Sequence, residues 1–541
     1  MNNLKLPPRL WCNKLINKIV SFVVRPMTVA PVYFLLLYLL IVFPDAFSFL
    51  QGNIFPLIIL VILASGFFFC YIMLLPVVLM PSFLRKIYKS VLLLCGIVYF
   101  SLNIYSIIIY DRSVNAFSPD IFAAVFATNT AETYEFVQMY FEYGRLFFIL
   151  SIITMLLILF YSLNRVKWHI RGVAKIVLFS FLIISIAVSV IKFDRVSAMN
   201  IYRLFASSQI YDLRDYRQSP TIVKYGDSPE NIVMIIGESF SKYHSLLYGY
   251  EKKTNPLLEK MVADSALYVY KGVESIALST IPSIKSIMAS YRNEYADSVA
   301  WYRCLNIIDV MKHSGFKTFW ASNQSKRGMG DNEIGRYAEL CDVELFVGNK
   351  YAGLHRTNLD EELFPYIDSC LCSSGRLNFI IVHLMGSHSA YNKRYPAEYE
   401  RFTVGEYENV YKGLPDDKKQ LVAEYDNSVL YNDSVVYEIM NKFLDKEAVV
   451  FYFSDHGEDV FRRNNTFIGH GNSESADIIK QIPFMVYTTK KFRERFPQME
   501  ERIKRAIDTP YRTDSVMYTI MDVAGIDSVN GISYKHKSLF K

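Results

Sequence analysis

The chain has 541 residues, 52% of them hydrophobic and 15% aromatic, and a formal net charge of +6 at neutral pH. This length exceeds an ordinary single domain, and the hydrophobic fraction is too high for a wholly soluble enzyme. The positive charge forms no basic patch interleaved with aromatic residues, so we expect no nucleic-acid partner.

Five long apolar runs occupy the first part of the chain, at residues 28–42, 54–80, 91–110, 146–163 and 173–191. A helix of about 20 residues crosses a hydrocarbon core. Because short polar connectors separate the runs, we predict a transmembrane domain of five helices over residues 1–195 rather than buried core helices. Further runs follow the first one and no small-residue cleavage site stands out, which argues against a cleaved signal peptide.

The connectors between these runs differ in charge. Basic residues without acids precede the first run and recur at 85–89 and 165–171, whereas the third connector, 111–145, is mainly acidic. Since basic connectors stay in the cytoplasm, we predict a cytoplasmic N-terminus and an outward-facing domain after the fifth run.

Residues 196–228 mix apolar and charged side chains without a spanning run. Tyr202, Phe205 and Ile210 fall on one helical face, which fits a helix along a membrane surface; a plain linker explains the composition equally well. We therefore predict a linker over 196–228 and a separate outer domain over 229–541.

The outer domain contains four cysteines, Cys304, Cys341, Cys370 and Cys372. Outside the cytoplasm, four cysteines could form two disulfides with three connectivities. Cys370 and Cys372 are too close in sequence for an easy mutual bridge, and no spacing fits a zinc finger. We expect these cysteines to be structural or free.

Several β-like runs of the outer domain end in polar residues. "NIVMIIGES" ends in Glu238, "LNFIIVHLMGSH" delivers His383 and His388, and "AVVFYFSDHGED" delivers Asp455 and His456. Helical segments lie between these runs, which predicts an α/β domain with a mainly parallel sheet. Since such sheets bind ligands outside the carboxyl ends of their strands, we expect these side chains to meet in one site.

The polar residues at the strand ends suit a zinc-like ion, which takes oxygen and nitrogen ligands and can keep one position open for catalysis. Alone, a DHG tripeptide is more often a solvated loop. Together with "IGES" and a later "GHG" that contains His470, it gives the order glutamate, then aspartate-histidine, then histidine. This order is much harder to obtain by chance. Gly457 permits a tight turn after His456.

The segments "IGESFSKYHSLLYGYEKKTNP", "HLMGSH", "SDHGED" and "GHG" resemble the motifs of the phosphoethanolamine transferases of Gram-negative envelopes, within the alkaline phosphatase and sulfatase superfamily. The five spans followed by an outer domain resemble this family too. The resemblance implies an inner-membrane enzyme with a periplasmic sulfatase-like catalytic domain. It would move phosphoethanolamine from phosphatidylethanolamine to lipopolysaccharide, on lipid A or the core, and we expect a monomer among membrane lipids.

The resemblance further implies a Zn²⁺ ion held by Glu238, Asp455, His456 and a threonine nucleophile. In "ESIALSTIPSIKSIMAS" we assign the nucleophile to Thr280, because it can open a helix whose N-terminus favours an anionic phosphate. The neighbouring Ser279 stays an alternative. Thr254 is a weaker one, since its segment matches the family upstream of the nucleophile.

The remaining site assignments also rest on the resemblance. It implies catalytic roles for His388 and His470 and substrate contacts for His383 and Lys326, with a satisfied core histidine as the alternative for each histidine. "ATNTAETYEF" resembles a segment that lines the lipid-substrate pocket, which implies substrate contacts for Thr128 and Glu132. The family asparagine one turn earlier is an alanine here, which leaves the bound head group open.

Two other enzyme classes share parts of this pattern. A sulfatase needs a cysteine or serine in a C/S-x-P-x-R context, whereas "STIPSIK" lacks the arginine and has the wrong spacing. A glycerol-phosphate transferase of the lipoteichoic-acid-synthase type shares the spans, the outer domain and the threonine, and would use phosphatidylglycerol as donor.

Overall fold

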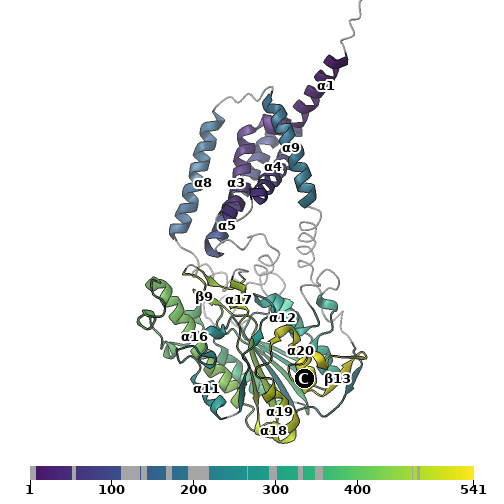
Figure 1. Cartoon of the computed structure of the whole chain (residues 1–541), viewed down its shortest axis with the longest axis vertical. Helices are drawn as coiled ribbons and strands as arrows, with labels where there is room; N and C mark the ends of the chain where they lie inside the picture. Colours follow the sequence, from purple (N-terminus) through teal and green to yellow (C-terminus); the bar gives the residue numbers. More distant parts are fainter. Residues whose placement is uncertain are drawn as a thin grey trace, which may run out of the picture. The chain divides into compact units, whose positions relative to one another are not determined.

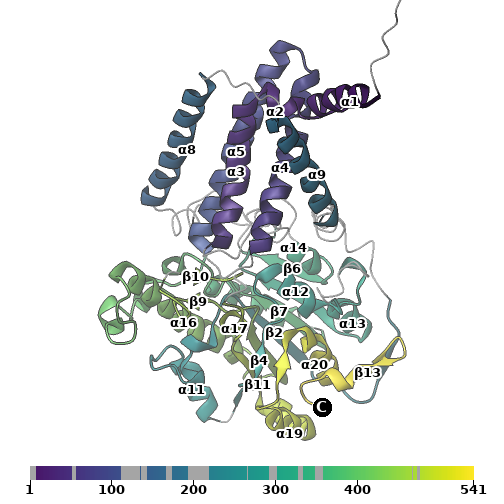
Figure 2. The same ribbon diagram turned by 45° about the horizontal axis from the view of Figure 1, so that its top comes forward.

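The computed structural model describes residues 8–50, 56–110, 135, 143–165, 173–192, 219–264, 266–291, 301–326, 333–347, 358–373, 375–465, 467–471 and 475–541. The chain divides into two compact units. One comprises Met1–Ile121 and Phe141–Ser208, and the other comprises Phe122–Tyr140 and Gln209–Lys541. Figures 1 and 2 show the first unit as purple and blue helices and the second as a sheet with helices in teal to yellow.

The first unit is helical, and all five predicted apolar runs lie in its helices. These are α1 (Pro8–Val23), α2 (Arg25–Val29), α3 (Pro31–Leu50), α4 (Pro56–Leu79), α5 (Ser82–Tyr110), α8 (Tyr143–Asn164) and α9 (Val173–Lys192). One apolar cluster joins α3 to α4 through Phe34 and Phe67, and another joins α3 to α5 through Leu40 and Phe100. Membrane crossing itself stays a prediction, and within the described ranges no helix meets the length and hydropathy that a span requires.

The second unit is built on a seven-stranded sheet with the order β3-β11-β8-β2-β7-β5-β6. Its strands are β2 (Asn231–Gly237), β3 (Leu267–Val269), β5 (Lys317–Ser322), β6 (Val343–Phe346), β7 (Asn378–His383), β8 (Ala448–Ser454) and β11 (Phe484–Thr488). The five strands from β8 to β6 are parallel, β11 pairs antiparallel with β8, and β3 pairs antiparallel with β11 at the edge. The predicted α/β domain with a mainly parallel sheet is confirmed.

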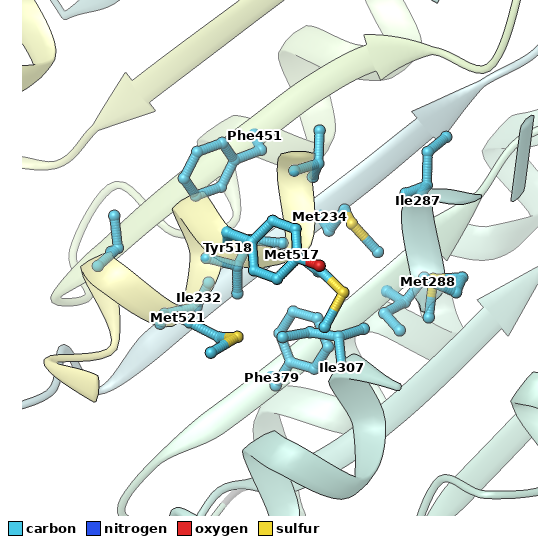
Figure 3. Close-up of a cluster of buried hydrophobic side chains, with 14 of the residues drawn as sticks. Ile232, Met234, Ile287, Met288, Ile307, Phe379, Phe451, Met517, Tyr518 and Met521 are labelled. Carbon is cyan, nitrogen blue, oxygen red and sulfur yellow. The ribbon is translucent and has the colours of Figure 1, made fainter. Parts of the chain in front are cut away.

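Helices cover both faces of this sheet, because alternate residues of a strand point to opposite sides. On one face, Ile232 and Met234 pack with α12 (Thr280–Met288), α13 (Ile307–His313) and α20 (Val516–Val523), as Figure 3 shows. On the other face, Val233 and Ile235 belong to a core with α11 (Pro256–Ala263), α15 (Phe364–Cys372) and α16 (Asp416–Asn441). Burial on both faces explains why the central strands read as continuous apolar runs.

Shorter elements complete the second unit. The helices are α14 (Glu333–Ala338), α17 (Ala476–Ile479), α18 (Lys490–Arg495) and α19 (Pro497–Arg505), and the strands are β1 (Ile222–Lys224), β4 (Val273–Glu274), β9 (Asp459–Val460), β10 (Ile468–Gly469), β12 (Tyr511–Arg512), β13 (Ile526–Val529) and β14 (Ile532–Ser533). Strand β1 lies inside the predicted linker yet pairs with β13, so the sheet-bearing unit begins before residue 229. Tyr202, Phe205 and Ile210 of the predicted surface helix lie outside the described residues.

Cys341, Cys370 and Cys372 of the second unit are free thiols. Cys341 and Cys370 are buried in the two cores on opposite faces of the sheet. The described part of the chain therefore carries none of the disulfides that the cysteine count allows, and the alternative expectation of free or structural cysteines fits.

Candidate active site

The two central strands deliver the acidic residues of the site side by side. Gly237, the last residue of β2, pairs with Ser454, the last residue of β8. The next residue along each strand is a carboxylate, Glu238 in one case and Asp455 in the other, and both are buried. His456 follows Asp455 directly. The parallel sheet therefore brings these side chains together, as the strand ends predicted.

Two glycines near the site pack closely against neighbouring backbone. A β-carbon added at Gly386 would lie 2.8 Å from the backbone nitrogen and oxygen of Glu238, and one added at Gly457 would lie 2.8 Å from the carbonyl oxygen of Ile479. Only glycine fits at these two positions without a shift of the chain. The requirement at Gly457 is thus close packing against the residues before β11.

Four side chains converge at the strand ends. The Oγ1 atom of Thr280 lies 3.3 Å from each carboxylate oxygen of Glu238 and 3.2 Å from Nε2 of His456. Nε2 of His456 lies 3.2 Å from Glu238 Oε1 and 3.4 Å from Asp455 Oδ2. Thr280 is the first residue of α12, so the N-terminus of that helix also faces the cluster.

The donor set fits a metal ion. One potential ligand atom each from Glu238, Asp455 and His456 lie within 4.8 Å of one another. Oδ1 of Asp455 accepts hydrogen bonds from two backbone N–H groups, whereas Oδ2 is buried without a hydrogen-bond partner. Nδ1 of His456 lies 2.9 Å from the carbonyl oxygen of Gly457, so Nδ1 donates, and a deprotonated Nε2 would turn its lone pair toward the carboxylates. A cation would satisfy the unpartnered oxygen and this lone pair.

The two carboxylates and the imidazole of the cluster are buried together, so each shifts the pKa of the others. Burial raises the pKa of Asp455, and the charge of Glu238 raises it further, to about 8. Burial lowers the pKa of His456, but the two carboxylates outweigh it and raise this pKa to about 10. Burial also acts to raise the pKa of Glu238, yet the hydrogen bond and charge of His456 hold it well below its usual range. Without a metal, the imidazolium of His456 neutralises the charge of Glu238, and Asp455 is protonated near pH 7.

A second histidine stands next to the first. The ring centroids of His456 and His470 are 4.3 Å apart. Nδ1 of His470 lies 2.8 Å from Glu458 Oε2, and the hydroxyl of Tyr391 donates to the other oxygen of Glu458 at 2.7 Å. Glu458 is buried, so this carboxylate fixes the orientation of the His470 ring.

The two histidines of the "HLMGSH" segment differ in exposure. His383 is the last residue of β7 and is completely buried, with Nδ1 3.3 Å from the hydroxyl of Ser322. This burial fits the alternative of a core histidine, and the substrate contact stays a prediction. His388 lies in the following loop and is half-buried. Burial lowers its pKa to about 4, so this imidazole is neutral at physiological pH.

Three further residues that the sequence singled out, Lys326, Thr254 and Ser279, lie among the described residues. Lys326 forms ion pairs with Glu344 and, at 3.4 Å, with Glu339, and its substrate contact stays a prediction. Thr254 is buried and donates to the carbonyl oxygen of His244 at 2.9 Å, which is a structural role. Ser279 occupies the N-cap position of α12 without a side-chain capping bond. Thr128 and Glu132 lie outside the described residues.

Two polar contacts of the site escaped the sequence analysis. Nε2 of Gln324 donates to Glu238 Oε2 at 3.0 Å and to the carbonyl oxygen of Leu384 at 3.1 Å. Gln324 follows β5, so the rule that pointed to the other strand ends would have identified it. Glu458 lies two residues after His456 in "SDHGED", and only the fold places it beside His470.

Comparisons with known proteins agree with this geometry. Residues 230–526, over half of the chain, match the sulfatase family. The chain is 25% identical to phosphoethanolamine transferase EptC of Escherichia coli O18:K1:H7, over 85% of this chain and 83% of that protein. The periplasmic domain of Escherichia coli EptC, solved in complex with Zn, is 26% identical and aligns with a TM-score of 0.55 over 60% of this chain and 89% of that one.

A third comparison concerns the fold of both units. The integral membrane protein lipooligosaccharide phosphoethanolamine transferase A from Neisseria meningitidis aligns with a TM-score of 0.64 at 18% identity, covering 94% of this chain and 98% of that one. The likeness therefore extends over the helical unit as well as the unit that carries the sheet.

Proposed function

The chain belongs to the sulfatase family, and from this premise we propose that it transfers phosphoethanolamine, with zinc, from phosphatidylethanolamine to lipopolysaccharide. The enzyme class that its motifs predicted, a phosphoethanolamine transferase, is confirmed by the relatives that bear this name. The zinc ion, the donor lipid, the acceptor and the residue roles are the parts that we add.

The position of Thr280 carries the proposal. Its hydroxyl oxygen lies 3.2 to 3.3 Å from Glu238 and His456, at the N-terminus of α12 and half exposed. A hydroxyl placed between metal ligands and a helix N-terminus is suited to attack a phosphorus atom whose charged oxygens the helix favours. The same position in a sulfatase of the formylglycine type would be a cysteine or a serine.

Glu238, Asp455, His456 and Thr280 would hold the zinc ion, since their ligand atoms converge and Asp455 Oδ2 is otherwise unpartnered. When bound, zinc supplies a Lewis acid that makes a neighbouring hydroxyl easier to deprotonate. The buried carboxylates set the charge of the pocket, and the helix N-terminus opposes the negative charge of the phosphate.

The reaction follows as two displacements at phosphorus. Thr280 Oγ1 forms a bond to the phosphorus of the donor lipid and releases its proton to solvent, and the bond to the diacylglycerol oxygen breaks. The departing oxygen takes a proton, which we assign to His470, because Glu458 holds its ring beside the cluster. In the second displacement an acceptor hydroxyl or phosphate attacks, neutral His388 takes its proton, and the bond between phosphorus and Thr280 Oγ1 breaks. Thr280 Oγ1 then takes the proton from His388, and His470 regains its own from solvent.

The helical unit fits an anchor in the cytoplasmic membrane. Large apolar side chains remain exposed on its helices, among them Leu79 at 83%, Phe147 at 75% and Val173 at 75%. Exposed apolar surface of this kind marks contact with lipid or another apolar partner. A reporter active only in the cytoplasm, fused after Lys541, should therefore be silent, and activity there would contradict a periplasmic catalytic unit.

Mass spectrometry of envelope lipids tests the overall function. Cells that express the protein should carry lipopolysaccharide enlarged by a phosphoethanolamine group, and cells with the Thr280→Ala variant should not. The position of the added group distinguishes a lipid A phosphate from a core sugar. Glycerol phosphate in its place would instead support the alternative donor, phosphatidylglycerol.

Replacing Glu458 by glutamine should lower kcat by about 10- to 100-fold, the usual effect of removing a group that orients a functional side chain. Glutamine keeps the shape of the side chain, but it no longer offers His470 an ionised acceptor. Rates measured at saturating donor lipid check this, with exposed Glu438 of α16 changed to glutamine as the control. A wild-type kcat in Glu458→Gln would remove Glu458 from this role.

The apparent affinity for zinc should rise with pH between about 6 and 8. The metal-free cluster binds protons on His456, with a pKa of about 10, and on Asp455, with a pKa of about 8. Both pKa values exceed the ordinary values of these groups, so zinc must displace protons that the pocket holds at neutral pH. Each released proton strengthens the apparent affinity about tenfold per pH unit. Zinc titrations at several pH values measure the slope, and a flat profile would contradict this protonation state.

A further inference from the structure

The loop that carries His388 is held at both of its ends. At its start, the buried carboxylate of Asp360 accepts hydrogen bonds from the backbone N–H groups of Met385 and Gly386 at 2.8 and 2.9 Å. At its end, Arg394 donates from Nε to the carbonyl oxygens of His388 and Ser389, each at 3.2 Å, and from Nη2 to Ser389 at 2.8 Å. The backbone position of His388 therefore depends on the guanidinium of Arg394.

Arg394 is itself 5% exposed, and a buried guanidinium requires a counter-charge. Glu135 supplies it. Nη2 of Arg394 forms an ion pair with Glu135 Oε2, and Nζ of Lys393 lies 3.8 Å from the other oxygen. Glu135 is 5% exposed as well. Glu135 belongs to the segment Phe122–Tyr140, which is part of the second unit although it interrupts the first unit in the sequence. It precedes Arg394 by 259 residues.

The loop also forms backbone hydrogen bonds with the end of β2 and with Glu238, which carries a predicted zinc ligand. The backbone N–H of Ser387 donates to the carbonyl oxygen of Glu238 at 3.0 Å, and that of Leu384 donates to Ile236 at 2.9 Å. A shift of the loop would move His388 and Glu238 relative to each other. Displacements of about 1 Å in a catalytic group can reduce rates strongly.

We propose that Glu135 is a positioning residue of the transferase, because its ion pair with Arg394 fixes the loop that presents His388 to the reacting phosphate. Glu135, which stands between α5 and α8 in the sequence, is thereby part of the catalytic apparatus of the second unit. This inference rests on the proposed function and adds a residue that acts through Arg394 without touching the phosphate.

The test uses full-length protein reconstituted in phosphatidylethanolamine vesicles, with diacylglycerol release as the readout. Glu135→Gln removes the charge and keeps the shape, and kcat should fall about tenfold while the KM for the donor changes less than about twofold. Zinc content should equal that of the wild type. The control is Asp368→Asn, which removes the carboxylate of the exposed ion pair with Lys442 and should leave kcat unchanged.

A double variant separates positioning from general destabilisation. If Glu135 acts through Arg394, Glu135→Gln combined with Arg394→Gln should be no slower than Arg394→Gln alone. Should Glu135→Gln fail to fold, Arg394→Lys carries the test, because lysine keeps the ion pair but loses the fork that holds both carbonyl oxygens. A reduced kcat in Arg394→Lys then supports the proposal, and a wild-type kcat overturns it.

Two outcomes with folded variants also overturn the inference: a wild-type kcat in Glu135→Gln, or losses that multiply in the double variant. Thr280→Ala, measured in parallel, distinguishes failure of the Glu135 inference from failure of the proposed function. If Thr280→Ala is inactive while Glu135→Gln retains full kcat, only the role of Glu135 fails. If Thr280→Ala stays active, the proposed chemistry itself fails.

Discussion

Thr280→Ala is expected to lower diacylglycerol release from phosphatidylethanolamine by roughly a thousandfold or more, as removal of a nucleophile does in other enzymes. The physical reason is position. Thr280 Oγ1 lies 3.2 Å from Nε2 of His456 and 3.3 Å from Glu238, and alanine removes the hydroxyl that stands between these two groups. Release of diacylglycerol from vesicles that contain the purified protein measures the effect.

The neighbouring hydroxyl provides the matched control. Ser279 is one residue away at the N-cap of α12, where its side chain makes no capping bond, so Ser279→Ala should retain most of the activity. Thr280→Ser should retain part of it, because it keeps the attacking oxygen but loses the methyl group that restricts the rotamer. Loss of activity in Ser279→Ala with full activity in Thr280→Ala would move the nucleophile to Ser279.

Asp455→Asn should abolish zinc binding and transfer together while leaving the metal-free fold intact. The pKa of Asp455 is raised to about 8, so near pH 7 the metal-free pocket holds the neutral acid, which asparagine resembles. Its carbonyl oxygen can still accept the hydrogen bonds of Ser239 and His456. Removing a group that merely supports a metal ligand lowers affinity about 10- to 100-fold, so losing a ligand should lower it more than about a hundredfold.

Thermal unfolding with and without zinc checks this second prediction. Wild-type protein should gain stability on zinc addition, whereas Asp455→Asn should unfold at the metal-free temperature in both conditions. Asp477→Asn serves as the control, since Asp477 is exposed and pairs only with Arg463 among its described partners. Full zinc occupancy in Asp455→Asn would exclude Asp455 as a ligand.

The convergence of Glu238, Asp455 and His456 could be predicted because it follows from one rule. Parallel neighbouring strands end at the same edge, so the residues directly after β2 and β8 must meet. The sequence could not separate Thr280 from Ser279, because adjacent hydroxyls at a helix start differ only in which way they point. That choice depends on where α12 packs against the sheet.

Residues whose partners are distant in sequence were the least predictable. The resemblance implies a substrate contact for His383, yet this residue ends β7 and is completely buried. The resemblance implies a substrate contact for Lys326, and the structure adds ion pairs with Glu339, just after α14, and with Glu344 of β6. Glu135 meets Arg394, which lies 259 residues further along the chain. No local pattern of charge or hydropathy encodes such pairs, because the fold alone decides which buried charges face each other.

The most direct test of a transferase with a threonine nucleophile is to map the covalent intermediate. Purified protein incubated with phosphatidylethanolamine, without acceptor, should carry a phosphoethanolamine group on the peptide that contains "ALSTIPSIK". Fragmentation of this peptide should place the group on Thr280, and the adduct should disappear when lipid A is added. Release of diacylglycerol with no adduct on any residue would contradict the account, since the group would then pass directly to the acceptor or to water.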